Sequence, residues 1–486
     1  MSDFNLAEYV LREGAARPDR LALAVLGPAR ADRWSYARLR QAVLGAATGF
    51  RAAGLRPGDR LLMRLGNRPA FPVAYLGAIA AGIVPVPTSS LLTAREVTRI
   101  AAETQPAAVV AGDGIALPDT PLPLTSEAQL TGFAELTPAA FAMGDPERLA
   151  YIIYTSGSSG QPRAVMHAHR AILARRAMFD GWYGLRRSDR LLHAGAFNWS
   201  FTLGTGLMDP WTMGATALIP AEGVALEQIP LLAARHGATI IAGAPGVFRR
   251  MLRADWRPLR DLRHGLSAGE RLDPALRAAW QARTGTDLHE AMGLSECSTF
   301  ISGSPARPAP EGAGGYPQSG RQVAILDEAG RSSDEGALAI HRTDPGLFLG
   351  YLGQADETAA RFSGDWFLTG DRARRLPCGA ISLLGRSDDM MNAGGFRTAP
   401  SEIEEVLSGV VGAGDVAVTE IAVAPGVTII AAFWTGPAPR ATLEAAAKAG
   451  LARYKQPRDY IALAELPRTA TGKINRRALR AAHDRT

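Results

Sequence analysis

Short apolar runs alternate with helical segments along much of this chain, and this pattern restricts the possible fold more than any other feature. The apolar runs cover residues 61–65, 107–111, 150–154 and 239–242. Helices are expected between them, at residues 68–81, 169–179 and 275–283. Strands that are apolar on both faces are typical of parallel sheets covered by helices, so the pattern predicts an α/β protein.

The chain has 486 residues, which is too long for one ordinary domain. We expect a large N-terminal domain of layered α/β subdomains at residues 1–385 and a small, mobile α+β domain at residues 386–486. In the second region, Ser401 to Glu404 has the pattern of a capping box that opens a helix through Leu407. A strand at 427–434, a helix at 441–453 and a strand at 459–463 are expected to follow.

Composition argues against several classes of function. The 53 basic and 47 acidic residues leave a net charge of +6, but the arginines are spread along the chain and interleaved with acids. Without a basic run that contains aromatic residues, a nucleic-acid surface is not expected, and a cleft for anionic small molecules fits the charge as well. The two cysteines form neither a disulfide framework nor a metal-ligand pattern.

No membrane span and no signal peptide are expected. The longest apolar stretch, residues 71–87, is interrupted by glycine and proline and is shorter than the roughly 20 residues that a span requires. It predicts a buried helix that leads into a strand. The N-terminus has no basic segment followed by an apolar run, so the sequence predicts a cytoplasmic protein.

A loop rich in serine and glycine follows the strand that ends at Tyr154. Its residues are Thr155, Ser156, Gly157, Ser158, Ser159 and Gly160, followed by Gln161, Pro162 and Arg163. Backbone N–H groups of such a loop can turn inward on an anion, and the hydroxyls can donate further hydrogen bonds. The spacing is not that of a Walker A motif. A ligand-free Ser/Gly connection is the alternative, but the loop is expected to be pinned between a buried strand and a helix.

Taken together, these motifs resemble those of the adenylate-forming superfamily, in particular its acid–CoA ligases. The signature loop at residues 154–163 is followed, in the family's order, by stretches at 290–296, 369–371, 385–389, 394–397 and 471–473. The resemblance implies that a carboxylic acid and ATP form an acyl-adenylate with the aid of Mg²⁺, and that a thiol then accepts the acyl group.

The resemblance also implies roles for individual residues. Lys473 matches the catalytic lysine, Glu296 the carboxylate near Mg²⁺, and Ser295 a hydroxyl that bonds phosphate. Asp371 matches the residue that accepts the ribose hydroxyls, and Arg386 donates to the same sugar. The adenine is expected to lie against Ser267, Ala268, Gly269 and Glu270, and against Glu290, Ala291, Met292 and Gly293.

The remaining expected roles concern the second half-reaction. Asp388 matches the hinge on which the small domain turns, and Gly394, Gly395 and Arg397 match the loop that lines the pantetheine tunnel of coenzyme A. The chain departs from the family in three places: Arg163 and Asn392 stand where lysine is common, and Met292 stands where an aromatic residue usually covers the adenine.

Lysine is scarce, which directs attention to one position. Only three of the 53 basic residues are lysines, namely Lys448, Lys455 and Lys473. A lysine ammonium is a compact charge on a flexible stem, whereas arginine is a planar fork, so the two are not equivalent at a tight site. A cation between a carboxylate and the α-phosphate would favour their reaction. The retained lysine at position 473 fits that role.

The acid pocket is expected at Phe197, Asn198 and Trp199, opposite Gly243 and Ala244. Relatives that activate amino acids place an aspartate after the phenylalanine, whereas here the residue is Asn198. This favours an aromatic or medium-chain acid, although core packing explains Phe197 and Trp199 equally well. No carrier segment follows Lys473, so free coenzyme A is the expected acceptor. The alternatives are a stand-alone aryl-acid adenylating enzyme that loads a separate carrier protein, and a non-catalytic nucleotide-binding scaffold.

Overall fold

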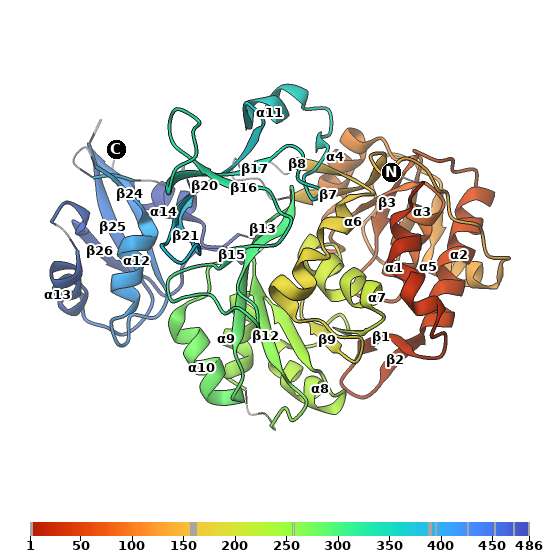
Figure 1. The fold of residues 1–486 in the computed structure, drawn as a ribbon, viewed down its shortest axis with the longest axis horizontal. Coiled ribbons are helices and arrows are strands. Elements are labelled where there is room, and N and C mark those ends of the chain that lie inside the picture. Colours follow the sequence, from red (N-terminus) through yellow and green to blue (C-terminus); the bar gives the residue numbers. More distant parts are fainter. Residues whose placement is uncertain are drawn as a thin grey trace. The chain divides into compact units, whose positions relative to one another are not determined.

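The chain forms two compact units, and the computed structural model describes residues 3–155, 163–254, 256, 258–386, 391–393, 396–424, 427–451, 453–469 and 472–484. Unit 1 comprises Met1–Gln322 and His341–Phe362, and unit 2 comprises Val323–Ile340 and Ser363–Thr486 (Figure 1). Unit 2 thus includes segments that precede the predicted boundary at residue 385. The predicted domain boundary at residue 385, and movement of the second domain about it, stay predictions.

Unit 1 is built on a nine-stranded sheet whose central strands are parallel, as the sequence predicts. Neighbouring strands from β13 to β1 pair in parallel, and the outer strands at both edges are antiparallel. In spatial order the strands are β15 (Tyr316–Pro317), β14 (Ser298–Ser302), β13 (Leu288–Leu294), β12 (His264–Ala268), β11 (Ile240–Gly243), β9 (Arg190–His193), β10 (Thr216–Pro220), β1 (Leu21–Leu26) and β2 (Ala31–Ser35).

Both faces of this sheet are covered at β1, whose six residues are all apolar. Leu23 and Val25 of β1 join one core cluster, whereas Ala24 and Leu26 join another on the opposite face. The second cluster packs under α8 (Ile229–Arg235), α9 (Pro245–Leu252) and α10 (Pro274–Thr284). The first includes residues of α1 (Leu6–Ala15), α2 (Tyr36–Ala52), α7 (Asp209–Met213) and the π-helix η3 (Thr202–Met208).

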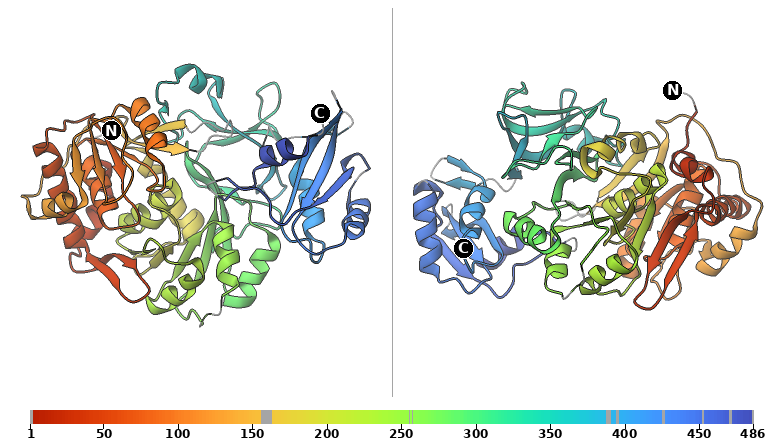
Figure 2. Two further views of the ribbon diagram at one scale, coloured as in Figure 1. Left: turned by 180° about the vertical axis from the view of Figure 1, so that it is seen from behind. Right: turned by 60° about the horizontal axis from the view of Figure 1, so that its bottom comes forward.

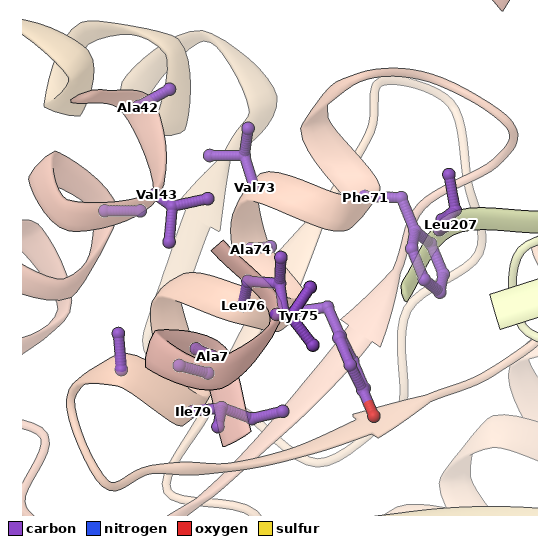
Figure 3. Packing of buried hydrophobic residues seen from close by; sticks show 14 of the residues in the cluster. Ala7, Ala42, Val43, Phe71, Val73, Ala74, Tyr75, Leu76, Ile79 and Leu207 are labelled. Carbon is purple, nitrogen blue, oxygen red and sulfur yellow. The ribbon is translucent and has the colours of Figure 1, made fainter. Parts of the chain in front are cut away.

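A second parallel sheet in unit 1 confirms two more predicted strands. Its order is β4 (Val84–Pro87), β3 (Arg60–Arg64), β5 (Ala108–Ala111) and β6 (Leu124–Ser126). The expected apolar helix is α3 (Ala70–Ala80), and every one of its residues is buried. Figure 3 shows its side chains packed among residues of α1 and α2, with Phe71 beside Leu207 of η3. Two capped helices, α4 (Ala94–Thr104) and α5 (Glu127–Gly132), complete this region.

The strand before the serine- and glycine-rich loop departs from the prediction. β7 (Leu149–Thr155) is followed by β8 (Arg163–Ala168), with which it pairs antiparallel, and β18 (Gly350–Tyr351) pairs with β8. The prediction of a helix directly after the loop is therefore wrong, and α6 (Ala171–Ala174) begins only after β8. The expected helix at 169–179 is likewise broken into α6 and a π-helix, η2 (Phe179–Tyr183).

Unit 2 contains a three-stranded sheet with helices on both faces (Figure 2). The order is β24 (Val416–Ala424), β25 (Val427–Trp434) and β26 (Asp459–Ala462). Val416 and Val418 face the cluster formed with α12 (Pro400–Ser408) and α13 (Arg440–Gly450), whereas Ala417 and Ile421 face α14 (Arg476–His483). The predicted strands and helices of this region are confirmed to within a few residues.

The remaining strands of unit 2 carry part of the candidate site. One sheet joins β16 (Val323–Leu326), β17 (Glu335–His341), β20 (Trp366–Arg375) and β19 (Phe362–Ser363), and β21 (Ile381–Arg386) pairs with β20. A short pair is formed by β22 (Met391–Ala393) and β23 (Phe396–Thr398). The predicted capping box at α12 is absent, because the Ser401 hydroxyl donates instead to the carbonyl of Leu384 at 2.7 Å.

The mixed α/β architecture predicted from the sequence is confirmed. In the part of the chain that the structure describes, no helix is long and apolar enough to cross a membrane. The cytoplasmic location stays a prediction.

Candidate active site

Four adjacent parallel strands bring most of the predicted site of unit 1 to one edge of its large sheet. β9 ends directly before the loop at 194–201, β11 before Ala244, β12 before Gly269, and β13 before Ser295. The four strands are neighbours in the order β13, β12, β11, β9, and all pairs are parallel. Ligands of open α/β sheets bind beyond the carboxyl ends of the strands, so this edge is the candidate site.

The stretches predicted to line the adenine lie side by side. Ser267 pairs with Glu290 across β12 and β13, and Ala268 pairs with Ala291. Gly269 follows with φ +97°, a left-handed conformation that favours glycine. A Cβ at this position would lie 3.2 Å from Cζ2 of Trp199. The loop at residues 194–201, here called the acid loop after the acid pocket predicted on it, therefore reaches residues 267–270 and 290–293, here called the adenine strip after their predicted role. A side chain at position 269 would meet the indole.

Glu290 supports this strip from within the core. Its carboxylate accepts a hydrogen bond from the backbone N–H of Leu272 at 2.9 Å, and it lies 4.0 Å from the Arg277 guanidinium. Burial raises the pKa of Glu290 to about 7. The expectation that Glu290 contacts the nucleotide stays a prediction, but its carboxylate already fixes the turn that follows Glu270.

The acid loop is held by the side chain of Asn67, which was not among the residues predicted from the sequence. The amide of Asn67 donates to the carbonyl of Gly195 at 2.8 Å, and its oxygen accepts from the N–H of Phe197 at 2.8 Å. The Phe197 ring packs against Phe71, with centroids 5.4 Å apart. Asn67 lies in the loop after β3 and belongs to none of the recognised motifs, so no local signal identifies it.

Two buried polar side chains flank the same loop without a hydrogen-bond partner among the described residues. They are His193, whose ring nitrogens are both unpaired, and Thr202. Burial lowers the pKa of His193 to about 3, so its imidazole is neutral and offers one donor and one acceptor. A Cβ on Gly195 would lie 2.1 Å from the Thr202 hydroxyl and 3.1 Å from Nδ1 of His193, so both groups lie against this glycine.

Glu296 lies at a corner that also contains Arg163 and Tyr351. The hydroxyl of Tyr351 donates to Oε1 of Glu296 at 2.8 Å. Burial, with the nearby charge of Glu296, raises the pKa of Tyr351, so the phenol remains a donor. The Arg163 guanidinium lies 5.2 Å from the centre of the Tyr351 ring and forms an ion pair with Glu357 of α11 (Ala355–Ala360). The structure thus joins two predicted site residues through a tyrosine that no motif marks.

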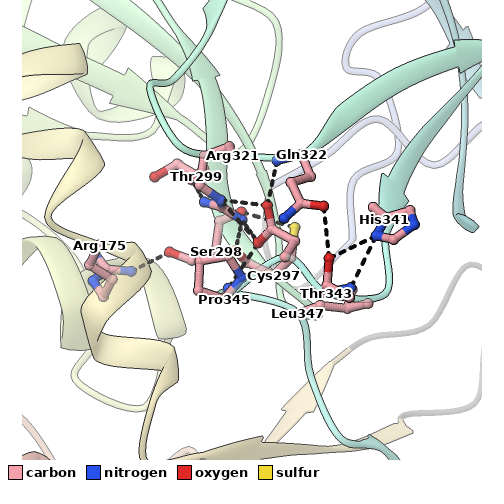
Figure 4. A network of polar contacts seen from close by, with 12 residues as sticks. Arg175, Cys297, Ser298, Thr299, Arg321, Gln322, His341, Thr343, Pro345 and Leu347 are labelled. Atoms are coloured by element: carbon pink, nitrogen blue, oxygen red, sulfur yellow. Dashed lines mark hydrogen bonds and ion pairs between the residues drawn. The ribbon is translucent and has the colours of Figure 1, made fainter. Parts of the chain in front are cut away.

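The turn that carries Glu296 is fixed on both sides by buried polar groups. Nε2 of His167 donates to the carbonyl of Ser295 at 2.7 Å. Burial lowers the pKa of His167 to about 4, and its ring stacks on Tyr151 with centroids 4.9 Å apart. On the other side, the Arg321 guanidinium donates to the carbonyl of Cys297 at 2.9 Å and pairs with Asp344 (Figure 4).

The serine- and glycine-rich loop is defined only at its two ends. Thr155 pairs with Arg163 across the β7–β8 hairpin, whereas Ser156, Gly157, Ser158, Ser159 and Gly160 lie outside the described residues. The loop therefore closes a hairpin and does not lead into a helix. Phosphate binding by its backbone N–H groups stays a prediction.

Within unit 2, the two residues predicted to bind ribose lie opposite each other. Asp371 on β20 pairs with Arg386 on β21, and their side chains approach to 3.5 Å. Oδ2 of Asp371 is buried and has no hydrogen-bond partner among the described residues. Burial raises the pKa of Asp371, while the charges of Arg386 and Lys473 oppose this effect. A sugar hydroxyl could satisfy this oxygen, so the residues present fit a ribose.

Lys473 lies in unit 2 next to Gly472, and its backbone carbonyl accepts a hydrogen bond. The N–H of Thr469 donates to the carbonyl of Lys473 at 2.7 Å, and Gly472 adopts φ +90°. The Lys473 side chain is exposed. The predicted hinge Asp388 and the glycines Gly394 and Gly395 lie outside the described residues, while Arg397 lies on β23.

A magnesium ion would meet few protein ligands here. No group of three His, Cys, Asp or Glu side chains that could hold a metal occurs among the residues that the structure describes. Magnesium is often bound by one or two carboxylates together with substrate phosphates. Glu296 fits that arrangement as a single carboxylate.

Comparison with known proteins agrees with this geometry. The model of the AMP-binding enzyme family matches residues 11–352, which is most of the chain. The chain belongs to the AMP-binding enzyme family. Its predicted membership of the acid–CoA ligase branch is confirmed by the relatives, so it is an AMP-forming acid–CoA ligase family enzyme.

Several characterised ligases are similar over nearly the whole chain. A 3-hydroxybenzoate–CoA/4-hydroxybenzoate–CoA ligase of Thauera aromatica is 30% identical, with 92% of this chain and 91% of the relative covered. A mitochondrial acyl-coenzyme A synthetase of Homo sapiens is 29% identical over 98% of this chain and 90% of its own length. The crystal structure of a benzoate CoA ligase from Burkholderia xenovorans superimposes with a TM-score of 0.88 at 28% identity, covering 98% of this chain and 100% of that chain.

The role of the two Asn67 hydrogen bonds in holding the acid loop can be tested with the variant Asn67→Ala. Loss of both hydrogen bonds should loosen the loop and raise the KM for the acid about 30-fold, because two hydrogen bonds of about 1 kcal/mol each contribute about 2 kcal/mol. The KM for ATP should change little. Steady-state kinetics with each substrate varied in turn measures this. Gln41→Ala is a matched control, since the Gln41 amide also donates to two backbone carbonyls, those of Ala134 and Leu136. Equal effects on both KM values would contradict a specific role for Asn67.

Glu290 should make folding stability depend on pH. A carboxyl whose pKa rises from 4.5 to about 7 on folding holds its proton longer in the folded state. The free energy of unfolding should therefore fall as pH rises from about 5 to 7, by roughly 3 kcal/mol from this group. Glu290→Gln keeps an oxygen for the Leu272 N–H but cannot ionise, so its stability relative to wild type should increase with pH. Urea unfolding at pH 5 and pH 8 checks this, and a pH-independent difference would contradict it.

Proposed function

We propose that this chain is an ATP-dependent carboxylic acid–CoA ligase that acts on an aromatic or medium-chain acid. A carboxylate oxygen of the acid bonds to the α-phosphorus of ATP, and the bond to diphosphate breaks. The thiol sulfur of coenzyme A then bonds to the acyl carbon of the adenylate, the thiol proton is lost, and AMP leaves. The products are acyl-CoA, AMP and diphosphate.

The observation that carries this proposal is the gathering of the acid loop, the adenine strip and the Glu296 turn at one edge of the large sheet. Trp199 lies against Gly269, so an acid beside the indole would lie next to the adenine strip. Relatives named for benzoate, for hydroxybenzoates and as mitochondrial acyl-coenzyme A synthetases support the choice of acid. Phe197 and Trp199 supply an apolar and aromatic lining.

Each proposed role follows from the chemistry of the residue. Glu296 holds Mg²⁺ together with the phosphates, and the ion supplies positive charge near the diphosphate that leaves. Asp371 and Arg386 hold the ribose, and Gly394, Gly395 and Arg397 bind coenzyme A after the small domain has turned at Asp388. Lys473 places an ammonium between the carboxylate and the α-phosphate, where preorganised charge lowers the barrier.

A screen for acid-dependent diphosphate release tests this function. The acids are benzoate, hydroxybenzoates, aminobenzoates and short to medium fatty acids. Hydroxybenzoates are included because His193 and Thr202 lack partners beside the acid loop. The ligase reading requires acyl-CoA to form with free coenzyme A. Diphosphate exchange without acyl-CoA favours the stand-alone adenylating enzyme, and ATP binding without exchange favours a scaffold.

Lys473→Arg should lose adenylation although its charge is retained. The fork of arginine cannot take the place of the compact ammonium, so acid-dependent diphosphate exchange should fall by about 10²- to 10³-fold, as in Lys473→Ala. Transfer of a supplied acyl-adenylate to coenzyme A should be spared in both variants. Lys448→Arg, on the exposed surface of α13, is the matched control. Near-normal exchange by Lys473→Arg would refute the requirement for an ammonium.

A further inference from the structure

The acid loop continues directly into η3, a π-helix that ends at a buried aspartate. All residues of η3, from Thr202 to Met208, are buried, and Asp209 follows with no exposed surface. π-Helical turns are rare and frequently occur at functional sites. The acid loop is therefore joined to the Asp209 carboxylate by a segment that is buried throughout.

One guanidinium, that of Arg175, is fixed against this segment. Its Nε and Nη2 donate to the two oxygens of Asp209 at 2.8 and 2.6 Å. The hydroxyl of Tyr183 donates to the same carboxylate at 2.7 Å. A Cβ on Gly204 would lie 2.3 Å from Cζ of Arg175, so the guanidinium packs against the backbone of η3 itself. The planar fork is thus oriented by two hydrogen bonds and by a close backbone contact.

The same guanidinium also reaches the turn that carries Glu296. Its Nη1 donates to the hydroxyl of Ser298, and a dashed line in Figure 4 marks this hydrogen bond. Ser298 lies two residues after Glu296 and has φ +63°, one of two positive φ values among the described non-glycine residues. A backbone held in this conformation requires support from its surroundings. Arg175 provides such support through the Ser298 side chain.

We propose that Arg175 is a positioning residue that couples the acid pocket to the Glu296 turn, so that acid and magnesium–nucleotide each strengthen the binding of the other. The proposal rests on the proposed function of the site. An acid that orders the loop before η3 holds η3 against the guanidinium, and the guanidinium supports Ser298 and the turn at Glu296. Coupling free energies between sites are reciprocal, so nucleotide binding strengthens acid binding by the same factor.

Ser298 is the residue at which to test the coupling, because changing it leaves the buried Arg175–Asp209 pair intact. Ser298→Gly removes the hydroxyl and relieves the strain of φ +63°, whereas Ser298→Ala removes the hydroxyl and keeps that strain. Arg175→Lys retains the charge but lacks the fork that spans Asp209 and Ser298. The matched control is Ser302→Ala, which removes another buried hydroxyl from β14 that donates to the carbonyl of Gly181 at 2.7 Å and does not contact Arg175.

The experiment measures the affinity of the full-length protein for an ATP analogue with a methylene group between the α- and β-phosphorus, in the presence of Mg²⁺. Titrations are run without acid and with saturating benzoate, 3-hydroxybenzoate, 4-hydroxybenzoate or hexanoate, whichever is most active in diphosphate exchange. In wild type and Ser302→Ala, the acid should tighten analogue binding at least fivefold. In Ser298→Gly, Ser298→Ala and Arg175→Lys this factor should fall toward one, and in Ser298→Gly the affinity without acid should change less than twofold.

The possible failures are distinguishable. A wild-type factor of one, or an unchanged factor in both Ser298 variants, overturns the coupling while leaving the ligase function intact. If Ser302→Ala loses the acid-dependent tightening of analogue binding to the same extent, the coupling is also overturned. The effect would then follow from removing any buried hydroxyl of β14 and would not require the contact with Arg175. If no acid of the full screen described under the proposed function supports diphosphate exchange, the proposed function fails, and the coupling that rests on it fails too.

Discussion

The parallel pairing of β9, β11, β12 and β13 is the constraint on which the candidate site depends. Parallel neighbours end at the same edge of a sheet, so segments that are far apart along the chain meet where these strands stop. The acid loop follows β9, and the Glu296 turn follows β13 about a hundred residues later. Parallel backbone pairing and buried side chains such as Leu191, Leu192, Ile240 and Ile241 hold this edge in place.

Buried polar side chains then fix the loops that the strands only bring together. Asn67 holds the acid loop, while His167, Tyr351 and Arg321 hold the turn at Ser295 and Glu296. The low pKa of His167 and the raised pKa of Tyr351 keep both groups neutral, so each remains a hydrogen-bond donor without the cost of a buried charge. The Glu296 carboxylate, a predicted site residue, thus accepts from a neutral phenol, and the backbone on either side of it is held by an imidazole and an arginine.

The sequence predicts the strands at 61–65, 107–111, 150–154 and 239–242, because each is a short apolar run and therefore a local signal. It does not predict that β12 pairs with β13, because pairing depends on the whole sheet. It does not predict Asn67, Tyr351 or Arg175, whose roles come from contacts with residues distant in the chain. The capping box at Ser401 is a local pattern that tertiary structure overrides, because the Leu384 carbonyl takes its hydroxyl. The hairpin at the serine- and glycine-rich loop was missed because its second strand, Arg163 to Ala168, contains polar residues that a periodicity argument does not assign to a strand.

The three lysines of the chain have different surroundings, and these bear on why lysine occurs at each position. Lys455 forms an ion pair with Glu402, and Lys448 lies in the last turn of α13, where a cation is favoured by the helix dipole. Lys473 differs from both, because its side chain is exposed while its backbone is bound at the carbonyl and follows a left-handed glycine. An exposed, compact ammonium on a flexible stem agrees with the proposed role of Lys473 between two anions. Arginine at this position would carry the same charge on a wider, planar group whose hydrogen bonds point in fixed directions. The proposed role therefore depends on the size and flexibility of the cation as well as on its charge.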